Sequence, residues 1–252
     1  MRRLLATGVA TLAILLATTT VVTATHSWST YHWARGANPL ALSLGDNLTP
    51  DWDGYLVTAS ADWSLSTVLE TTIVAGSTTG RKCKPSAGNV QVCNAAYGRN
   101  GWLGLAQIWI SGGHITQGVA KMNDTYFKMD RYNNTSEKLH VVCQEIAHTF
   151  GLGHQDESGI SLDTCMDYYH NTSDADTQST RPNAHDYEQL ELIYGSHTDG
   201  AASAAFSPLT ALGAAEDGTP HGASRARGSW YAQDLGNGRF LLTHVFWAPF
   251  GH

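Results

Sequence analysis

The sequence predicts an α+β fold, in which strands in the first part of the body precede helices. Three observations support this class. Segments rich in β-forming residues dominate the first half of the chain, apolar residues at helical spacing follow them, and a strong two-residue turn lies near the C-terminus. The chain has 252 residues, of which 42% are hydrophobic and 15% are charged, so it is long enough to bury one good core.

The first expected elements follow a short bridging segment, residues 25–37, and open the main body, residues 38–195. Alternating or β-rich apolar segments predict strands, and aromatic and aliphatic residues at helical spacing behind a Thr-Pro start predict a helix. The expected strands are Asn38–Leu44, Leu69–Ala75, Asn89–Asn94, Leu103–Ser111 and His114–Met122, and the first expected helix is Asp51–Ser64.

Two further helices are expected in the second half of the body. Apolar residues recur at helical spacing from Leu139 to Phe150, and Gly151 provides a stop. A last helix is expected over about His185 to Tyr194, with Asn183 as its N-cap.

The C-terminal part of the chain predicts a linker and a β-hairpin. Residues 196–228 are rich in Ala, Gly, Ser and Pro, a composition that cannot bury much and is typical of a linker. In residues 229–252, the segments Ser229–Asp234 and Arg239–Trp247 flank Asn237-Gly238, the strongest signal for a two-residue hairpin turn. Because an isolated hairpin is marginal in water, we expect it to pack against the body.

Charge argues against one class of partner. Lys and Arg total 15 against 22 Asp and Glu, which gives a formal net charge of -7. Binding to nucleic acid or to an anionic membrane depends on clustered basic residues. We therefore expect a monomer with no nucleic-acid partner and no membrane association after processing of the N-terminus.

The N-terminal residues predict export. Two arginines precede an apolar stretch from Leu4 to Val22, and small residues follow it, which is the layout of a secretory signal peptide. We expect residues 1–24 to be removed by cleavage near Ala24 and the protein to be extracellular. The alternative is an uncleaved anchor, since the apolar stretch is almost long enough to span a bilayer.

Export bears on the four cysteines, which are expected to pair in an oxidising compartment in one of three ways. We favour Cys83 with Cys93, which closes a short loop containing Pro and Gly, and Cys143 with Cys165. Each disulfide should stabilise the fold by roughly 3 kcal/mol. A zinc site built from the cysteines is disfavoured because the C-x2-C spacing is absent.

The most informative stretch is CQEIAHTFGLGHQD, which begins at Cys143. Glu145 and His148 match the second and third fixed positions of the zinc pattern H-E-x-x-H-x-x-G-x-x-H, and Gly151 and His154 match the last two. Gln144 stands where the first histidine belongs.

The spacing of this pattern has a physical reason. Residues 144 and 148 are one helical turn apart, so their side chains can converge on one ion. Gly151 can take a positive φ that turns the chain sharply and brings His154 back to the same ion. Three ligands and one open position describe a catalytic zinc site.

A second feature follows, the segment TCMDY centred on Met166. It resembles the Met-turn of the metzincin metallopeptidases, the clan that includes matrixins, astacins and snapalysin. In that clan a methionine lies beneath the zinc site, and some branches place a tyrosine two residues later near the metal; Met166 and Tyr168 match these positions. The resemblance covers about Asn38 to Gly195. It implies a metzincin-like fold, a twisted mixed β-sheet with an active-site helix and a C-terminal helix, and the activity of a zinc metalloendopeptidase.

Gln144 is a departure from the metzincin pattern. A glutamine oxygen is a weaker zinc ligand than an imidazole, so zinc affinity should fall and preference could move toward another ion such as Cu²⁺. The gametolysin-like branch of the clan resembles this chain in having glutamine here, which implies that such a site can still be a peptidase site. Asp156 is another candidate ligand, whereas His140 is about 12 Å along the helix axis from His148 and too far away.

With an ion held by Gln144, His148 and His154, the metal would polarise the scissile carbonyl and lower the pKa of its bound water, and Glu145 would accept the proton from that water. Tyr168 could donate a hydrogen bond to the developing oxyanion.

The expected substrate is an extended peptide or protein that adds as a strand to a sheet edge, for which we choose His114–Met122. A rival hypothesis, motivated by the glutamine at position 144, is a pseudopeptidase that acts as a secreted metal- or peptide-binding module.

Overall fold

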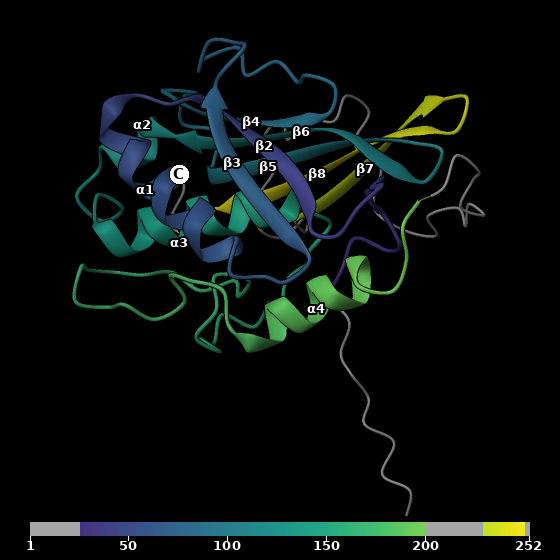
Figure 1. Ribbon diagram of the computed structural model, residues 1–252. Helices are drawn as coiled ribbons and strands as arrows, with labels where there is room; N and C mark the ends of the chain where they lie inside the picture. Colours follow the sequence, from purple (N-terminus) through teal and green to yellow (C-terminus); the bar gives the residue numbers. More distant parts are fainter. Residues whose placement is uncertain (1–25, 200–228, 250–252) are drawn as a thin grey trace, which may run out of the picture.

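A computed structural model describes residues 26–199 and 229–249 and shows a single mixed, twisted β-sheet with helices (Figure 1). The strands are β1 (His32–Trp33), β2 (Leu40–Asn47), β3 (Leu69–Ala75), β4 (Asn89–Ala95), β5 (Trp102–Ser111), β6 (His114–Asn123), β7 (Trp230–Gly236) and β8 (Arg239–Trp247). The helices are α1 (Pro50–Trp63), α2 (Asp124–Phe127), α3 (Thr135–His148) and α4 (Ala184–Tyr194). The predicted α+β class is confirmed.

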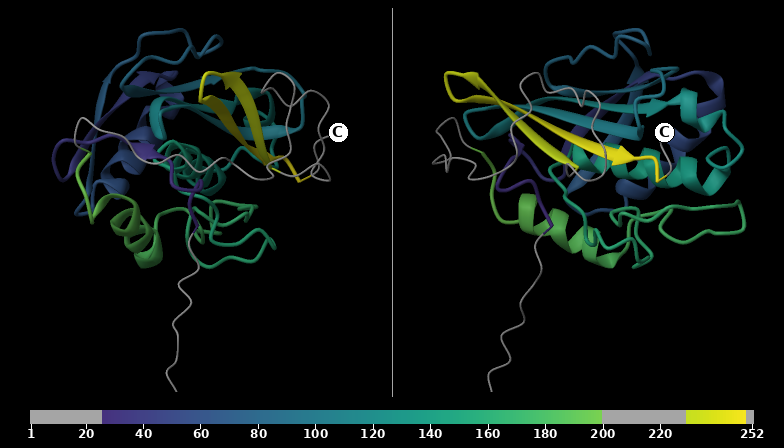
Figure 2. Two further views of the ribbon diagram at one scale, coloured as in Figure 1. Left: turned by 90° about the vertical axis from the view of Figure 1, so that its right-hand side faces the viewer. Right: turned by 180° about the vertical axis from the view of Figure 1, so that it is seen from behind.

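The strand order is β3-β2-β4-β6-β5-β8-β7, and the short β1 pairs with β6 outside this path. Helices α1 and α3 lie against one face of the sheet, and α4 lies beyond them, farther from the sheet (Figures 1 and 2). The core fills the space between α1, α3 and the sheet. There the fully buried Trp63 packs edge-on against Phe150, with ring centroids 5.8 Å apart, and donates its indole N–H to the Cys143 carbonyl.

Helix α3 begins earlier than the apolar pattern predicts. Its N-cap is Asn134, whose side chain accepts the Glu137 N–H at 2.8 Å. The first turn is Thr-Ser-Glu-Lys, which carries no apolar residue, so the periodicity becomes visible only at Leu139. Asn183 caps α4 as predicted. The short β1 and α2 were not predicted because two and four residues are too few to show a period.

The predicted C-terminal hairpin is confirmed, and it joins the sheet. Asn237 and Gly238 have φ values of 56° and 69°, the left-handed conformations of a tight hairpin turn. β8 pairs antiparallel with β5 along its length, from Trp102↔Trp247 to Ser111↔Arg239. The main-chain groups of β5 that would otherwise form an edge are therefore used by β8.

The choice of His114–Met122 as the edge strand is wrong. β6 pairs with β4 on one side and with β5 on the other, so no free main-chain edge remains for a substrate. The physical reason is the reversal at Gly112 and Gly113, whose positive φ values fold β5 back onto the outer side of β6. On this side of the sheet, β5 is the outermost strand formed by the predicted body, and β3 is the outermost strand on the other side.

Both favoured disulfides are present. Cys83–Cys93 spans 10 positions of the sequence and ties a loop to β4. Cys143–Cys165 spans 22 positions and ties α3 to the TCMDY segment.

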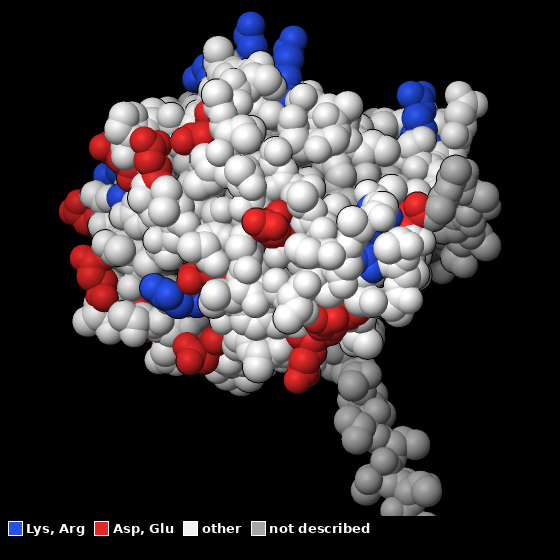
Figure 3. All heavy atoms as spheres, in the orientation of Figure 1, with Lys and Arg blue, Asp and Glu red and all other residues white. Residues whose placement is uncertain are grey.

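Residues 1–24, the predicted signal, and nearly all of the predicted linker lie outside the described residues. Within the described residues, no helix is both long and apolar enough to span a bilayer. On the face drawn in Figure 3, acidic and basic groups are scattered and no continuous basic area is visible.

Candidate metal centre

The end of α3 brings two of the predicted residues together. His148 is the last residue of the helix and is fully buried. Gly151 has a φ of +97°, and a Cβ at this position would lie 2.5 Å from the Tyr31 carbonyl oxygen, so both conformation and space require glycine. The chain turns sharply there, and the imidazole rings of His148 and His154 lie 4.9 Å apart.

A third imidazole comes from the hairpin. One ring nitrogen from each of His148, His154 and His244 lies within 4.8 Å of the other two. His244 lies in β8, and its ring centroid is 3.9 Å from that of His148 and 4.6 Å from that of His154. Sequence analysis missed this residue. The available signal was a lone titratable residue inside an apolar strand, LLTHVFW.

Each of the three rings is oriented by a hydrogen bond at Nδ1. Each Nδ1 faces an oxygen acceptor: Leu152 O at 2.8 Å from His148, Glu157 Oε1 at 2.9 Å from His154, and Glu145 Oε2 at 3.2 Å from His244. Because the Leu152 carbonyl oxygen only accepts, Nδ1 of His148 carries a hydrogen and its Nε2 is left to bind an ion. All three Nε2 atoms are buried without a hydrogen-bond partner. Histidine ligands of zinc show this arrangement.

Burial keeps two of these rings neutral. His148 and His244 are both 0% exposed, and their burial lowers the pKa of each well below its usual value. Three imidazoles that bring one ring nitrogen each to a shared region form a donor set that suits Zn²⁺ and also Cu²⁺.

The amide nitrogen of Gln144 is hydrogen-bonded to the TCMDY segment. Nε2 donates to the carbonyls of Cys165 at 2.9 Å and Asp167 at 2.6 Å, while Oε1 is buried without a partner. Among the described residues, the third possible ligand that lies in one group with His148 and His154 is therefore His244. Asp156 is not in that group, and its Oδ2 accepts from the N–H and hydroxyl of Ser158.

Glu145 lies next to the imidazole cluster and is 0% exposed. Burial raises its pKa well above the ordinary value. A Cβ on Gly104 of β5 would lie 2.5 Å from Glu145 Oε1 and 2.7 Å from Val141 Cγ1, so only glycine allows β5 to pass this close. The carboxyl group is therefore fixed between α3 and β5, with Oε2 toward His244 and Oε1 free of partners.

Met166 and Tyr168 lie beside the segment that carries His154. The carbonyl of Met166 accepts the Gln155 N–H at 2.7 Å, and the Tyr168 N–H donates to Asp156 O at 2.9 Å. Met166 is fully buried, and the ring of Tyr168 lies edge-on to that of His154 at 5.3 Å.

The hydroxyl of Tyr168 is occupied by the hairpin. It donates to Val245 O at 3.4 Å and accepts the Trp247 N–H at 2.7 Å.

Trp230 of β7 covers the cluster. Its ring centroid lies 5.0 Å from His148, 5.1 Å from His154 and 4.6 Å from His244. Its indole N–H donates to Glu157 Oε1 at 2.8 Å. The side chain of His154 is 1% exposed, and Figure 2 shows the hairpin running alongside α3. The hairpin thus closes the imidazole cluster off from solvent.

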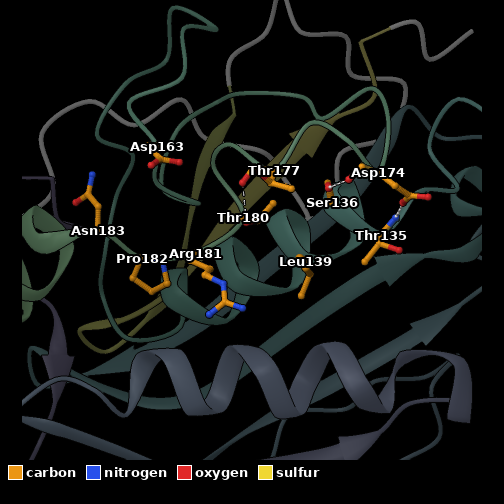
Figure 4. Close-up of a pocket in the computed structure, with 10 residues that line it drawn as sticks. All are labelled: Thr135, Ser136, Leu139, Asp163, Asp174, Thr177, Thr180, Arg181, Pro182 and Asn183. Atoms are coloured by element: carbon orange, nitrogen blue, oxygen red, sulfur yellow. Dashed lines mark hydrogen bonds between the residues drawn. The ribbon is translucent and has the colours of Figure 1, made fainter.

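An open hollow of about 730 Å³ lies elsewhere, at the start of α3 and the 163–183 loop (Figure 4). It is lined by Thr135, Ser136, Leu139, Asp163, Asp174, Thr177, Thr180, Arg181, Pro182 and Asn183. None of these residues belongs to the imidazole cluster.

No protein-family model and no curated protein matches this chain. Among solved structures, myroilysin is 12% identical with a TM-score of 0.38, covering 68% of this chain and 98% of that one. High choriolytic enzyme 1, a hatching enzyme zinc-protease from Oryzias latipes (medaka fish), is 10% identical with a TM-score of 0.36, covering 66% of this chain and 95% of that one. A function for this chain therefore rests on its own side chains.

Proposed function

We propose that the chain is a secreted, zinc-dependent metalloendopeptidase. The observation that carries this proposal is the convergence of one ring nitrogen from each of His148, His154 and His244 beside the buried carboxyl of Glu145. The Nε2 atoms of all three rings are buried and have no hydrogen-bond partner. The two disulfides are typical of a protein that works in an oxidising compartment, which supports secretion.

The residues fit a zinc-class ion. With the hairpin in place, the imidazoles of His148, His154 and His244 would hold it. When His244 leaves with the hairpin, Gln144 Oε1, buried and unpartnered, would take its place as the third ligand. When bound, the ion would polarise the scissile carbonyl and lower the pKa of a bound water toward 7.

Two protein side chains would then transfer the proton and stabilise the negative charge of the oxyanion. Glu145 would accept the proton of the attacking water and pass it to the leaving amine. Tyr168 would donate a hydrogen bond from its hydroxyl group to the oxyanion. Glu145 and Tyr168 are both hydrogen-bonded to β8 in the structure, an arrangement that we call the closed form. Turnover therefore requires the hairpin to release them. An extended peptide would pair with β5 once that strand is free.

The test is metal analysis of the purified full-length chain together with casein cleavage, with and without a chelator. We expect metal in the purified protein, cleavage that the chelator abolishes, and a rate at least about 100-fold lower in Glu145→Gln, a variant of nearly the same shape. Cleavage that survives both the chelator and this substitution would exclude the proposal.

A second candidate is a secreted metal- or peptide-binding module without turnover. The observation that favours it is the complete burial of Glu145 and its contact with His244, which leave no access for water or substrate in the closed form. Stoichiometric metal without cleavage under any condition would select this candidate.

A further inference from the structure

We propose that this chain binds a second divalent metal ion, at His32, His197 and Asp199. These residues lie outside the imidazole cluster described above. His32 belongs to β1, and the other two follow the end of α4.

The distances between the three ligand atoms fit a single ion. His32 Nε2 lies 3.2 Å from His197 Nε2 and 3.3 Å from Asp199 Oδ1, and the third side of the triangle is 3.4 Å. Atoms bound at about 2.1 Å to a tetrahedral zinc lie about 3.4 Å apart. The triangle therefore matches one face of a zinc tetrahedron and leaves the fourth position for water.

Hydrogen bonds around the triangle aim these atoms at a cation. His32 Nδ1 lies 2.8 Å from Thr30 O, which only accepts, so Nδ1 carries a hydrogen and Nε2 is the ring nitrogen left to bind an ion. Asp199 Oδ2 accepts the Arg35 N–H at 2.9 Å, which turns Oδ1 toward the histidines. His32 Nε2 and Asp199 Oδ1 thus face one another at 3.3 Å, an arrangement in which both atoms can bind one shared cation.

The environment combines burial with access. His32 is 8% exposed and the Asp199 side chain 12%, whereas the His197 side chain is 41% exposed and gives an ion a route to the site. The ring of His32 is packed edge-on against those of His114 and Tyr194 at 4.8 and 6.1 Å. A metal here would tie the N-terminal segment to the residues that follow α4.

The test counts metal ions in the full-length chain, by elemental analysis after dialysis and by the absorbance of bound Co²⁺. We expect two ions per wild-type chain and one in each of His32→Ala, Asp199→Asn and His154→Ala. We expect none in His32→Ala/His154→Ala. His185→Ala is the matched control, because that imidazole belongs to neither group of ligands, and it should keep both ions.

Asp199→Asn keeps an oxygen for the Arg35 N–H, so the fold should survive even if His32→Ala is unstable. Equal metal content in wild type, His32→Ala and Asp199→Asn would overturn the second site and leave only hydrogen bonds among His32, His197 and Asp199 in its place. One ion that is lost in His32→Ala but kept in His154→Ala would support the second site and refute the proposed catalytic centre.

A different observation carries a second inference, which rests on the proposed function. We infer that the β7–β8 hairpin is an intramolecular inhibitor that occupies the substrate position on β5. β8 forms the antiparallel ladder with β5 from Trp102↔Trp247 to Ser111↔Arg239. Addition of a strand to this edge is how an extended peptide would bind, so hairpin and substrate compete for the same main-chain groups.

The hairpin also blocks the chemistry at three points. His244 Nδ1 contacts Glu145 Oε2, and His244 Nε2 takes a place among the candidate metal ligands that an incoming water would need. The main chain of β8 binds the Tyr168 hydroxyl on both sides. One strand thus engages the base, the metal position and the oxyanion donor together.

Packing makes this closed state the dominant one. Val245, Phe246 and Trp247 of β8 are at most 2% exposed and lie in the main core. β7, in contrast, pairs only with β8 among the described strands and is partly exposed along its length. Activation would therefore require displacement of the hairpin, and a substitution that removes the His244 contacts should favour that displacement.

The test is His244→Ala in the full-length chain. We expect the ion held by His148 and His154 to be retained, with Gln144 as third ligand, and casein cleavage to rise at least tenfold. Loss of that ion would overturn the inference and make His244 a permanent ligand. A variant that keeps the ion and still cleaves no faster than wild type would overturn it as well.

A disulfide lock provides a second test. Gln107 Nε2 donates to Thr243 Oγ1 at 3.1 Å across the β5–β8 pair, so a Gln107→Cys/Thr243→Cys variant can join the two strands. Once oxidised, this variant should keep its metal and show no cleavage, whereas Thr243→Cys alone should behave like wild type. A locked variant that cleaves casein at the wild-type rate would show that the hairpin does not inhibit.

If the proposed function is wrong, the cleavage results differ from those expected when only the inhibitor inference is wrong. If the chain is no peptidase, none of these variants cleaves casein, and neither does the wild type under any condition. Hydrogen exchange of the β5 amides in His244→Ala then still reports whether the hairpin opens.

Discussion

At the residue scale, the candidate centre depends on close contacts that leave no room for an added atom. Gly104→Ala would place a Cβ 2.5 Å from Glu145 Oε1 and 2.7 Å from Val141 Cγ1, both on buried side chains. Relief of such overpacking typically costs about 1–3 kcal/mol. We expect Gly104→Ala to lower the free energy of unfolding by that amount and to displace the Glu145 carboxyl.

Urea denaturation and casein cleavage measure these two effects. Gly54→Ala is the matched control, because Gly54 lies exposed inside α1 and a Cβ there meets no atom within 4 Å. It should leave stability unchanged or raise it by about 0.5–1 kcal/mol. Equal effects of the two substitutions would contradict the predicted contact.

A pH dependence is expected from His26. Burial lowers its pKa from 6.5 to about 4, although the Gly153 carbonyl accepts from its Nδ1. A lowered folded-state pKa means that the unfolded chain binds the proton more readily between pH 6.5 and 4, so stability falls as the pH falls through this window. The shift corresponds to about 3 kcal/mol.

Urea denaturation of wild type and His26→Asn at pH 7 and pH 4.5 checks this expectation. Asparagine keeps an N–H for Gly153 and does not titrate. The difference in free energy of unfolding between the two pH values should be smaller in the variant. Identical pH profiles would show that His26 is not the group responsible.

At the scale of elements, the two disulfides should have different consequences. Cys143–Cys165 closes a loop of 22 positions and Cys83–Cys93 one of 10, so the loop-entropy model makes the first more stabilising by about 0.7 kcal/mol. Only Cys143–Cys165 joins α3 to the segment of Met166 and Tyr168.

We therefore expect a Cys143→Ala/Cys165→Ala variant to lose metal affinity as well as stability, and a Cys83→Ala/Cys93→Ala variant to lose stability alone. Metal titration and thermal unfolding of the two variants separate these effects. Comparable loss of metal affinity in both would show that the link between α3 and the TCMDY segment does not organise the centre.

At the scale of the whole molecule, metal binding should couple to folding, because its candidate ligands come from α3, from the segment after it and from β8. A ligand present at 1,000 times its dissociation constant stabilises a fold by about 4 kcal/mol. We expect a chelator to lower the unfolding temperature of the wild-type chain. In His32→Ala/His154→Ala, which lacks a ligand at each proposed site, the chelator should have no effect, and any remaining sensitivity would point to a third site.

Elements with a strong local pattern were predictable. The strands of the body, the hairpin and its Asn237-Gly238 turn follow from periodicity and turn chemistry, which act over a few residues. The start of α3 was missed because a polar first turn carries no apolar signal.

The sequence by itself determined the α+β class, the helix that carries Glu145 and His148, and the glycine turn that returns His154, because spacing and backbone conformation are local properties. Only the tertiary structure decided which strand lies outside β6, and that β8 covers β5 and brings His244 to the cluster. The pairing of β8 with β5 joins segments more than a hundred positions apart, and no local pattern records such a contact. The proximity of His32 to His197 and Asp199 could not be predicted for the same reason, because His32 is also far from the other two residues in the sequence.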